Sequence, residues 1–136
     1  MSGATSRALK EELAGFIAGE RLISDPLRLL MWGTDASFSR LVPEIAVVVE
    51  SEDEVRHLLE ACARFAAPVT FRAAGTCLSG QAITDSALMV LGDGWRGCAL
   101  GIDAATVHAA ARSNRCHSQR PAHQRRPWRL DHHEQQ

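Results

Sequence analysis

The sequence predicts an α+β fold, in which an N-terminal helical segment precedes a small, largely parallel sheet of three strands. Three apolar runs predict the strands: Ile45–Val49, Val69–Arg72 and Ala87–Leu91. An amphipathic helix over residues 51–65 separates the first two runs, which together form a βαβ unit. Because parallel strands place their carboxyl ends at one edge of the sheet, we expect a ligand at the loops that follow them.

Two helices are predicted before the sheet. Apolar residues recur at helical spacing over residues 6–19, with charged residues on the other face. An Asp-Pro pair begins a second, short helix over residues 26–31, because proline at the first helical position has no N–H to satisfy. Residues 33–37 are predicted to form a loop. There Asp35 could face a ligand, but a local cap is the commoner use of such a residue.

The helix between the first two strands has a well-defined start. Ser51 is expected to accept a hydrogen bond from the amide of Glu54, and the Glu54 carboxylate is expected to reach back to the start of the helix. Three acidic residues in this first turn also suit the positive end of the helix dipole.

Composition and charge describe an ordinary globular chain. It has 136 residues, of which 46% are hydrophobic and 23% charged, and its formal net charge is −1. That charge excludes a strong overall attraction to nucleic acid or to an anionic membrane. The N-terminal residues lack the apolar core of a signal peptide, and no apolar run is long enough to cross a bilayer. Since the four cysteines form no close pair, we expect reduced thiols in a cytoplasmic protein.

The loop after the second strand is the candidate ligand site. A strand that runs into a loop of small residues delivers backbone N–H groups to one point, and the usual guest of converging N–H donors is an anion such as phosphate. An arginine at the end of the strand could hold its guanidinium beside a diphosphate, while two hydroxyls add further donors. The candidate residues are Arg72, Ala73, Ala74, Gly75, Thr76, Cys77, Leu78, Ser79, Gly80 and Gln81.

Other interpretations of this loop stay open on spacing alone. Gly75 and Gly80 are spaced as in the first part of a Walker A loop, but Gln81 stands where that loop needs a lysine, which excludes nucleotide hydrolysis. A Gly-x-Gly-x-x-Gly arrangement is absent from the sequence. A plain turn between two strands explains the glycines as well as a ligand does. Cys77 is a weaker candidate for a reactive thiol, because the sequence places no base beside it.

Taken together, residues 43–55 and 68–81 resemble the opening of the FAD-linked oxidase family, which includes vanillyl-alcohol oxidase, p-cresol methylhydroxylase, glycolate oxidase and D-lactate dehydrogenase. Residues 32–43 most resemble the D-lactate dehydrogenase branch. The resemblance covers residues 20–98, approximately, and each motif is weak alone. It implies the fold of the first subdomain of a p-cresol methylhydroxylase-type FAD-binding domain.

The resemblance also implies a cofactor and a reaction. In this family the loop equivalent to residues 72–81 wraps the FAD diphosphate, and the intact enzymes oxidise 2-hydroxy acids, such as D-lactate or glycolate, by hydride transfer to the flavin. Thr76 stands where members with covalently bound FAD have histidine, which implies non-covalent FAD. Cys77 stands where serine is common, and a thiol is the weaker hydrogen-bond donor.

No residue is assigned a catalytic role, because the second half of the cofactor site and the substrate domain would lie beyond the family-like stretch. We therefore expect a truncated FAD-binding portion that is inactive alone, or a half-site completed by a separate subunit. The predicted division is a helical segment over residues 1–40, a partial FAD-binding subdomain over 41–98 and an atypical, disordered tail over 99–136.

The tail differs from the rest of the chain in composition. A helix with few large apolar residues is predicted over residues 103–112, and the last 26 residues hold six arginines and four histidines. The spacing of its cysteines and histidines matches no structural zinc site, so no metal is expected. A truncation or a shift of reading frame would explain the change, and the neighbouring frames of the gene would test this hypothesis.

A rival function from another class rests on the same tail. The chain could be a non-enzymatic interaction module whose Arg- and His-rich tail binds an acidic partner or nucleic acid. Nucleic acid is the less expected partner, because Trp128 alone is a poor platform for stacking bases. Binding to DNA with a steep salt dependence, by protein that shows no flavin absorbance, would favour this rival.

Overall fold

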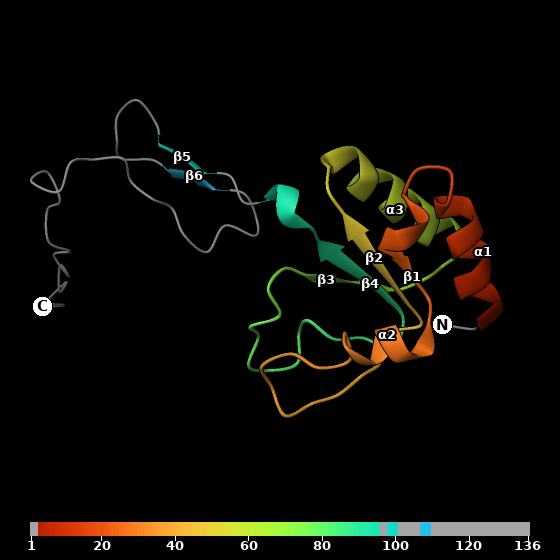
Figure 1. The fold of residues 1–136 in the computed structure, drawn as a ribbon, viewed down its shortest axis with the longest axis horizontal. Helices are drawn as coiled ribbons and strands as arrows, with labels where there is room; N and C mark the ends of the chain where they lie inside the picture. Colours follow the sequence, from red (N-terminus) through yellow and green to blue (C-terminus); the bar gives the residue numbers. More distant parts are fainter. Residues whose placement is uncertain (1–2, 96–97, 101–106, 110–136) are drawn as a thin grey trace, which may run out of the picture.

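The computed structural model describes residues 3–95, 98–100 and 107–109, and Figure 1 shows their arrangement. A mixed sheet lies between helices, and a separate two-stranded pairing follows it. In chain order the elements are α1 (Gly3–Leu13), the 3-10 helix η1 (Gly19–Arg21), β1 (Leu22–Ile23), α2 (Pro26–Leu30), β2 (Ile45–Val49), α3 (Glu52–Arg64), β3 (Val69–Arg72), β4 (Ala87–Leu91), the 3-10 helix η2 (Asp93–Trp95), β5 (Cys98–Leu100) and β6 (Val107–Ala109).

The main sheet has the strand order β1-β2-β4-β3. Strand β4 lies between β2 and β3 and is parallel to both, so the three parallel strands end at the same edge. At that edge Val49 pairs with Leu91, and Arg72 pairs with Val90. All five residues of β4 are buried, as expected for a parallel strand covered on both faces. The predicted α+β fold with a largely parallel sheet is confirmed.

A fourth strand was not predicted. Strand β1 pairs antiparallel with β2, with Leu22 opposite Val47 and Ile23 opposite Ala46. It has only two residues, which is too short for any periodicity to be visible in the sequence. Both of its side chains are buried, so it closes the sheet on the side away from β3.

One face of the sheet is covered by α1 and α3, which pack against each other. Their apolar stripes meet the side chains of alternate strand residues, and burying these groups is the main source of stability. This cluster consists of Leu9, Leu13, Ile17, Leu22, Ile45, Val47, Val49, Leu58, Ala61, Cys62, Ala67, Ala87, Met89 and Leu91.

The other face of the sheet carries a smaller apolar cluster beneath α2. It contains Ile23, Leu29, Ala46, Leu88 and Val90, with Trp32 and Val48 packed against it. The short helix α2 begins as predicted, because the Asp25 carboxylate accepts a hydrogen bond of 2.9 Å from the amide of Arg28. The loop that follows α2 is therefore anchored close to the sheet.

The first helix ends earlier than predicted. The sequence pattern places it over residues 6–19, whereas α1 spans Gly3–Leu13. The amides of Phe16 and Ile17 both turn back to the carbonyl of Leu13, so a tight turn replaces the last turns of the helix. This turn exposes about half of Phe16 but still buries Ile17, which explains why the apolar spacing was misleading.

The second correction concerns residues 103–112, which the sequence predicts to be helical. Val107–Ala109 instead forms β6, which pairs antiparallel with β5, and the rest of that stretch lies outside the described residues. A helix with few large apolar residues gains little from packing, and its nucleation is costly. Pairing with a second strand satisfies the backbone N–H and C=O groups without the nucleation of a helix. Of the tail predicted over residues 99–136, the structure describes only residues 99–100 and 107–109, and the rest lies outside the described residues.

Glu54 ties the start of α3 to the segment before β1. Both of its oxygens accept hydrogen bonds of 2.7 Å from the Arg21 guanidinium, and the same guanidinium reaches the carbonyl of Val48. The carboxylate also reaches back before the helix, as predicted, and accepts from the amide of Glu50, while Ser51 caps the Glu54 amide as expected. The hydrogen bonds from Arg21 lower the pKa of Glu54.

We expect Glu54→Gln to lower the free energy of unfolding at neutral pH by about 1 kcal/mol, since the ion pair is partly exposed to solvent. Because the folded-state pKa of Glu54 lies below the unfolded value of about 4.3, the contribution of its charge is complete above that pH. It is lost as the pH falls through the folded-state pKa, where wild type and variant should converge. Urea unfolding across this range measures the difference.

The matched control is Glu60→Gln, which removes an exposed carboxylate from the same helix. It should change the free energy of unfolding little at any pH. A difference between wild type and Glu54→Gln that stays constant down to about pH 2, well below the ordinary glutamate range, would contradict the assigned role of the charge.

Candidate functional site

Three loops leave the carboxyl edge of the parallel strands, and their backbone amides are used differently. After β2 the chain enters α3 through its cap. After β4 the amides of Asp93 and Gly94 donate hydrogen bonds of 3.3 and 2.7 Å to the carboxylate of Glu50. These donors are therefore already occupied by the protein itself.

The loop after β3 has the longest run of amides without a protein acceptor among these three connections. Within the described part of the chain, the amides of residues 74–81 donate no hydrogen bond to any protein acceptor. Gly75 and Gly80 have φ values of +69° and +74°, a backbone region that disfavours residues with a side chain. Thr76 and Ser79 are exposed. The loop thus presents free amide and hydroxyl donors at the edge where ligands of parallel sheets usually bind.

Arg72 lies beneath this loop. Its Nη1 donates hydrogen bonds to three carbonyls, those of Thr34 at 2.8 Å and of Trp32 and Ala82 at 3.3 Å. The guanidinium also stacks over the ring of Trp32, 5.4 Å from its centre. Its Nη2 and Nε have no partner among the described residues, so Arg72 holds the two loops together with one nitrogen and keeps the others free.

Gly75 brings the backbone of the loop into close contact with this positive charge. A Cβ atom at residue 75 would collide with the guanidinium of Arg72. Only glycine allows so close an approach, and its positive φ points to the same requirement. The charge of the guanidinium therefore adds to the partial positive charges of the free amides, and both favour an anion.

A second loop, over residues 33–39, packs against the first. The amide of Ala36 donates to the carbonyl of Gly75 at 3.1 Å, and the amide of Ala82 donates to Asp35 Oδ2 at 3.4 Å. Asp35 also accepts from the amide of Ser37 at 2.9 Å, which is the predicted local cap. The hydrogen bonds from Ser37 are the main reason that the pKa of Asp35 is lowered.

Sequence reasoning missed the partnership of these two loops. It identified residues 72–81 and treated Asp35 mainly as a local cap, but it predicted no contact between the two loops. The loops are far apart in the sequence, and no periodicity links them. The side chains of Ser37 and Ser39 also lie next to Gly80, where a Cβ atom would come within 3.4 Å of Ser39 Cβ.

The remaining candidates contribute no further chemistry. Among the described side chains, no group of three or more potential ligands could hold a metal ion. Cys62 and Cys77 are free thiols, and burial raises the pKa of Cys62. Cys116 and the histidines of the C-terminal tail lie outside the described residues, as does every feature of the rival interaction module. None of the described helices is long and apolar enough to span a membrane.

Two surface grooves lie away from the loop over residues 72–81. A groove of about 600 Å³ runs between α1 and α3, and one of about 660 Å³ lies beside α2, lined by Leu27, Leu30 and Val42 among others. Neither groove includes a residue of the loop over 72–81. The free amides, rather than the size of a cavity, therefore distinguish the candidate site.

Comparison with known proteins shows the family to which the chain belongs. Residues 43–116, more than half of the chain, match the model of a family described as FAD binding domain. The chain belongs to this FAD binding domain family. The match includes the whole loop over 72–81 and continues beyond residue 98, where the resemblance seen in the sequence ends. A search of the curated proteins finds no match.

Solved structures share the fold at low sequence identity. P-cresol methylhydroxylase with substrate bound matches with a TM-score of 0.56 and 11% identity, over 67% of this chain and 19% of that chain. Alkyldihydroxyacetonephosphate synthase matches with a TM-score of 0.58 and 14% identity, over 70% and 21%. A variant of Physcomitrella patens BBE-like 1 matches with a TM-score of 0.55 and 17% identity, over 74% and 22%. The chain thus spans about a fifth of the length of each.

We expect Gly75→Ala to lower the free energy of unfolding by about 1–2 kcal/mol, the cost of a left-handed backbone for a residue with a side chain. The added methyl group must also push aside the guanidinium of Arg72. Urea unfolding of the full chain measures the effect. Gly19→Ala is the matched control, because a Cβ at residue 19 meets nothing within 4 Å. Equal effects of the two substitutions would show that Gly75 is not constrained as described.

Proposed function

We propose that residues 72–81 bind the diphosphate of FAD, as part of a flavin-dependent oxidoreductase. The observation that carries this proposal is the set of amides over residues 74–81 that have no protein acceptor in the described part of the chain. These donors are open to a ligand, and a run of backbone N–H groups at the end of a parallel strand favours an anion. Membership of the FAD binding domain family supports FAD as that ligand.

The residues present fit a dinucleotide diphosphate. The loop offers backbone N–H donors, the exposed hydroxyls of Thr76 and Ser79, and the free nitrogens of Arg72. Each charge-assisted hydrogen bond to a phosphate oxygen contributes about 1.5–3 kcal/mol, so several acting together suffice to retain a cofactor. When bound, FAD supplies the hydride-accepting chemistry, and this chain supplies its position and electrostatic environment.

We further propose that FAD is bound without a covalent link. Thr76 occupies the position at which the resemblance places histidine in members with covalently bound FAD, and no residue from 72 to 81 is a histidine. The histidine of α3, His57, stacks instead on Phe16 with ring centres 4.3 Å apart, and it belongs to the helical face of the sheet. The loop itself therefore offers no imidazole to attach to the flavin.

The proposed substrate class is a 2-hydroxy acid such as D-lactate or glycolate. This part of the proposal is supported by the resemblance of residues 32–43 and 68–81 to the D-lactate dehydrogenase and glycolate oxidase branch. No described residue is proposed as catalytic. Because the chain spans about a fifth of the solved relatives, we propose that it is inactive alone.

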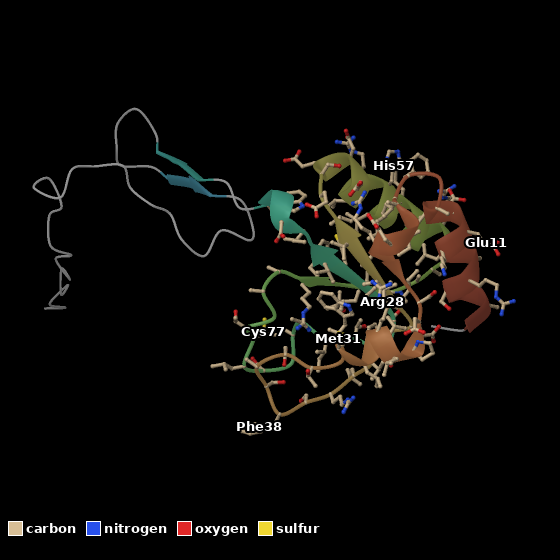
Figure 2. All side chains as sticks on the ribbon, in the orientation of Figure 1. Glu11, Arg28, Met31, Phe38, His57 and Cys77 are labelled. Carbon is tan, nitrogen blue, oxygen red and sulfur yellow. The ribbon has the colours of Figure 1, made fainter. Side chains whose placement is uncertain are left out.

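A separate polypeptide is the proposed source of the rest of the flavin domain. Large apolar side chains of the loop and of the segment before β2 face solvent. Leu78 of the loop is 80% exposed, Met31 is 77% exposed and Phe38 is fully exposed. Figure 2 shows Met31, Phe38 and Cys77 at one end of the molecule, away from Glu11 and His57. Exposed apolar groups gathered beside a cofactor site suit a protein partner. Co-purification of a second flavin-domain polypeptide would support this role, and its absence would count against it.

Titration of the full chain with FAD, followed by flavin fluorescence, tests the proposed function. We expect wild type to bind FAD and Arg72→Ala to bind it about tenfold more weakly, because the substitution removes a charged donor and loosens both loops. Binding should also weaken as the salt concentration rises. Arg56→Ala is the matched control, since Arg56 is exposed on α3 and pairs with Asp53.

Two outcomes would contradict the proposal. One is a wild-type chain that does not bind FAD. The other is an affinity for FAD that Arg72→Ala and Arg56→Ala reduce equally, since the effect would then come from net charge rather than from the loop.

A further inference from the structure

The segment Thr34–Ala36 contacts both ends of the loop that we propose binds FAD. At the start of the loop, the amide of Ala36 donates to the carbonyl of Gly75 at 3.1 Å. At the far end, the amide of Ala82 donates to Asp35 Oδ2 at 3.4 Å. Residues 76–81, between these two contacts, are left with their amides free of protein acceptors in the described part of the chain.

Asp35 uses its two oxygens for two different purposes. Oδ1 accepts the amide of Ser37 and so shapes its own loop, while Oδ2 accepts the amide of Ala82 in the other loop. Arg72 strengthens the same junction, because its Nη1 donates to the carbonyls of Thr34 and Ala82. The side chain of Asp35 therefore sits between the main chains of two loops rather than facing outward.

The negative charge of Asp35 needs an explanation, because it lies next to a loop that we propose binds a phosphate. A carboxylate beside an anion-binding loop repels a phosphate, so a neutral side chain would favour the ligand more. The hydrogen bonds from Ser37, followed by smaller contributions from Ala82 and Arg72, lower the pKa of Asp35 from a value already far below neutral, so the carboxylate is charged at neutral pH. A negative group in this place is explained if the hydrogen bond that it accepts from Ala82 contributes more to binding than the repulsion costs.

We propose that Asp35 is a positioning residue for the FAD diphosphate, which sets the span of the loop by holding its far end at Ala82. The inference rests on the proposed function, and it assigns to the loop over 33–39 a role in shaping the site. Ligand contacts come from residues 72–81, and Asp35 acts through them. Its removal should therefore affect cofactor affinity more than stability.

The test uses Asp35→Asn in the full chain. The asparagine oxygen can still accept the amide of Ser37, but its NH₂ group cannot accept the amide of Ala82. Asp35→Ser is the second variant, because serine can also form a local turn but is too short to reach the other loop. Asp85→Asn is the matched control, since Asp85 is exposed close to the same loop.

Two measurements are made on each protein. The first is the NMR chemical shift of the backbone amides of residues 74–82 in the absence of FAD. The second is the affinity for FAD, measured by flavin fluorescence. We expect both Asp35 variants to shift these amides and to bind FAD about tenfold more weakly, with an unfolding midpoint close to that of wild type. Asp85→Asn should change neither.

The outcomes separate this inference from the proposed function. If wild type binds FAD and the Asp35 variants bind it equally well, the inference is overturned and the proposed function stands. If wild type does not bind FAD, the proposed function fails and the inference, which rests on it, is overturned with it. If wild type binds FAD but the amides of residues 74–82 keep their shifts in both Asp35 variants, Asp35 does not position the loop and the inference alone is overturned. A fall in affinity matched by an equal loss of stability would also overturn it.

Discussion

A single guanidinium holds the candidate site together. Arg72 ends β3, and its side chain turns away from the strand to meet carbonyls from two loops and the face of Trp32. Each of these carbonyls would otherwise need water or another donor, and leaving a buried acceptor unpaired costs about 1–3 kcal/mol. A lysine could not replace it, because its ammonium lacks the planar shape that allows stacking and several directed bonds at once. The position of both loops depends on this residue.

The sheet decides where the free donors lie. Because β4 is central, its carboxyl end is flanked by the ends of both parallel neighbours, and the protein's own groups fill the gap next to β2. Glu50 occupies the amides that follow β4, and Glu54 occupies the amide of Glu50. On the β3 side of the edge, a continuous run of amides over residues 74–81 has no protein acceptor in the described part of the chain. Carboxylates of the protein itself therefore pair with the amides that follow β4, whereas the loop after β3 has no such internal acceptor.

The sequence predicts what local forces decide. Five consecutive apolar residues in β2, the Ser51 cap and the glycines of the loop each have a local cause, and each is found where it was expected. The two-residue strand β1 and the early end of α1 depend on tertiary packing, which no periodicity reports. For the same reason the contact between Asp35 and Ala82 was not foreseen, although both loops had been recognised as loops.

Strand β3 is the least protected member of the sheet. It has a neighbour on one side only, and none of its residues is fully buried, whereas every residue of β4 is. Local opening of a protein begins where few contacts must be broken, so the outermost strand should detach before the rest of the sheet unfolds. The loop over 72–81 would move with it. A ligand that binds the loop only while β3 is paired with β4 therefore also stabilises this pairing. Slower hydrogen exchange of the β3 amides would then report that the ligand is bound.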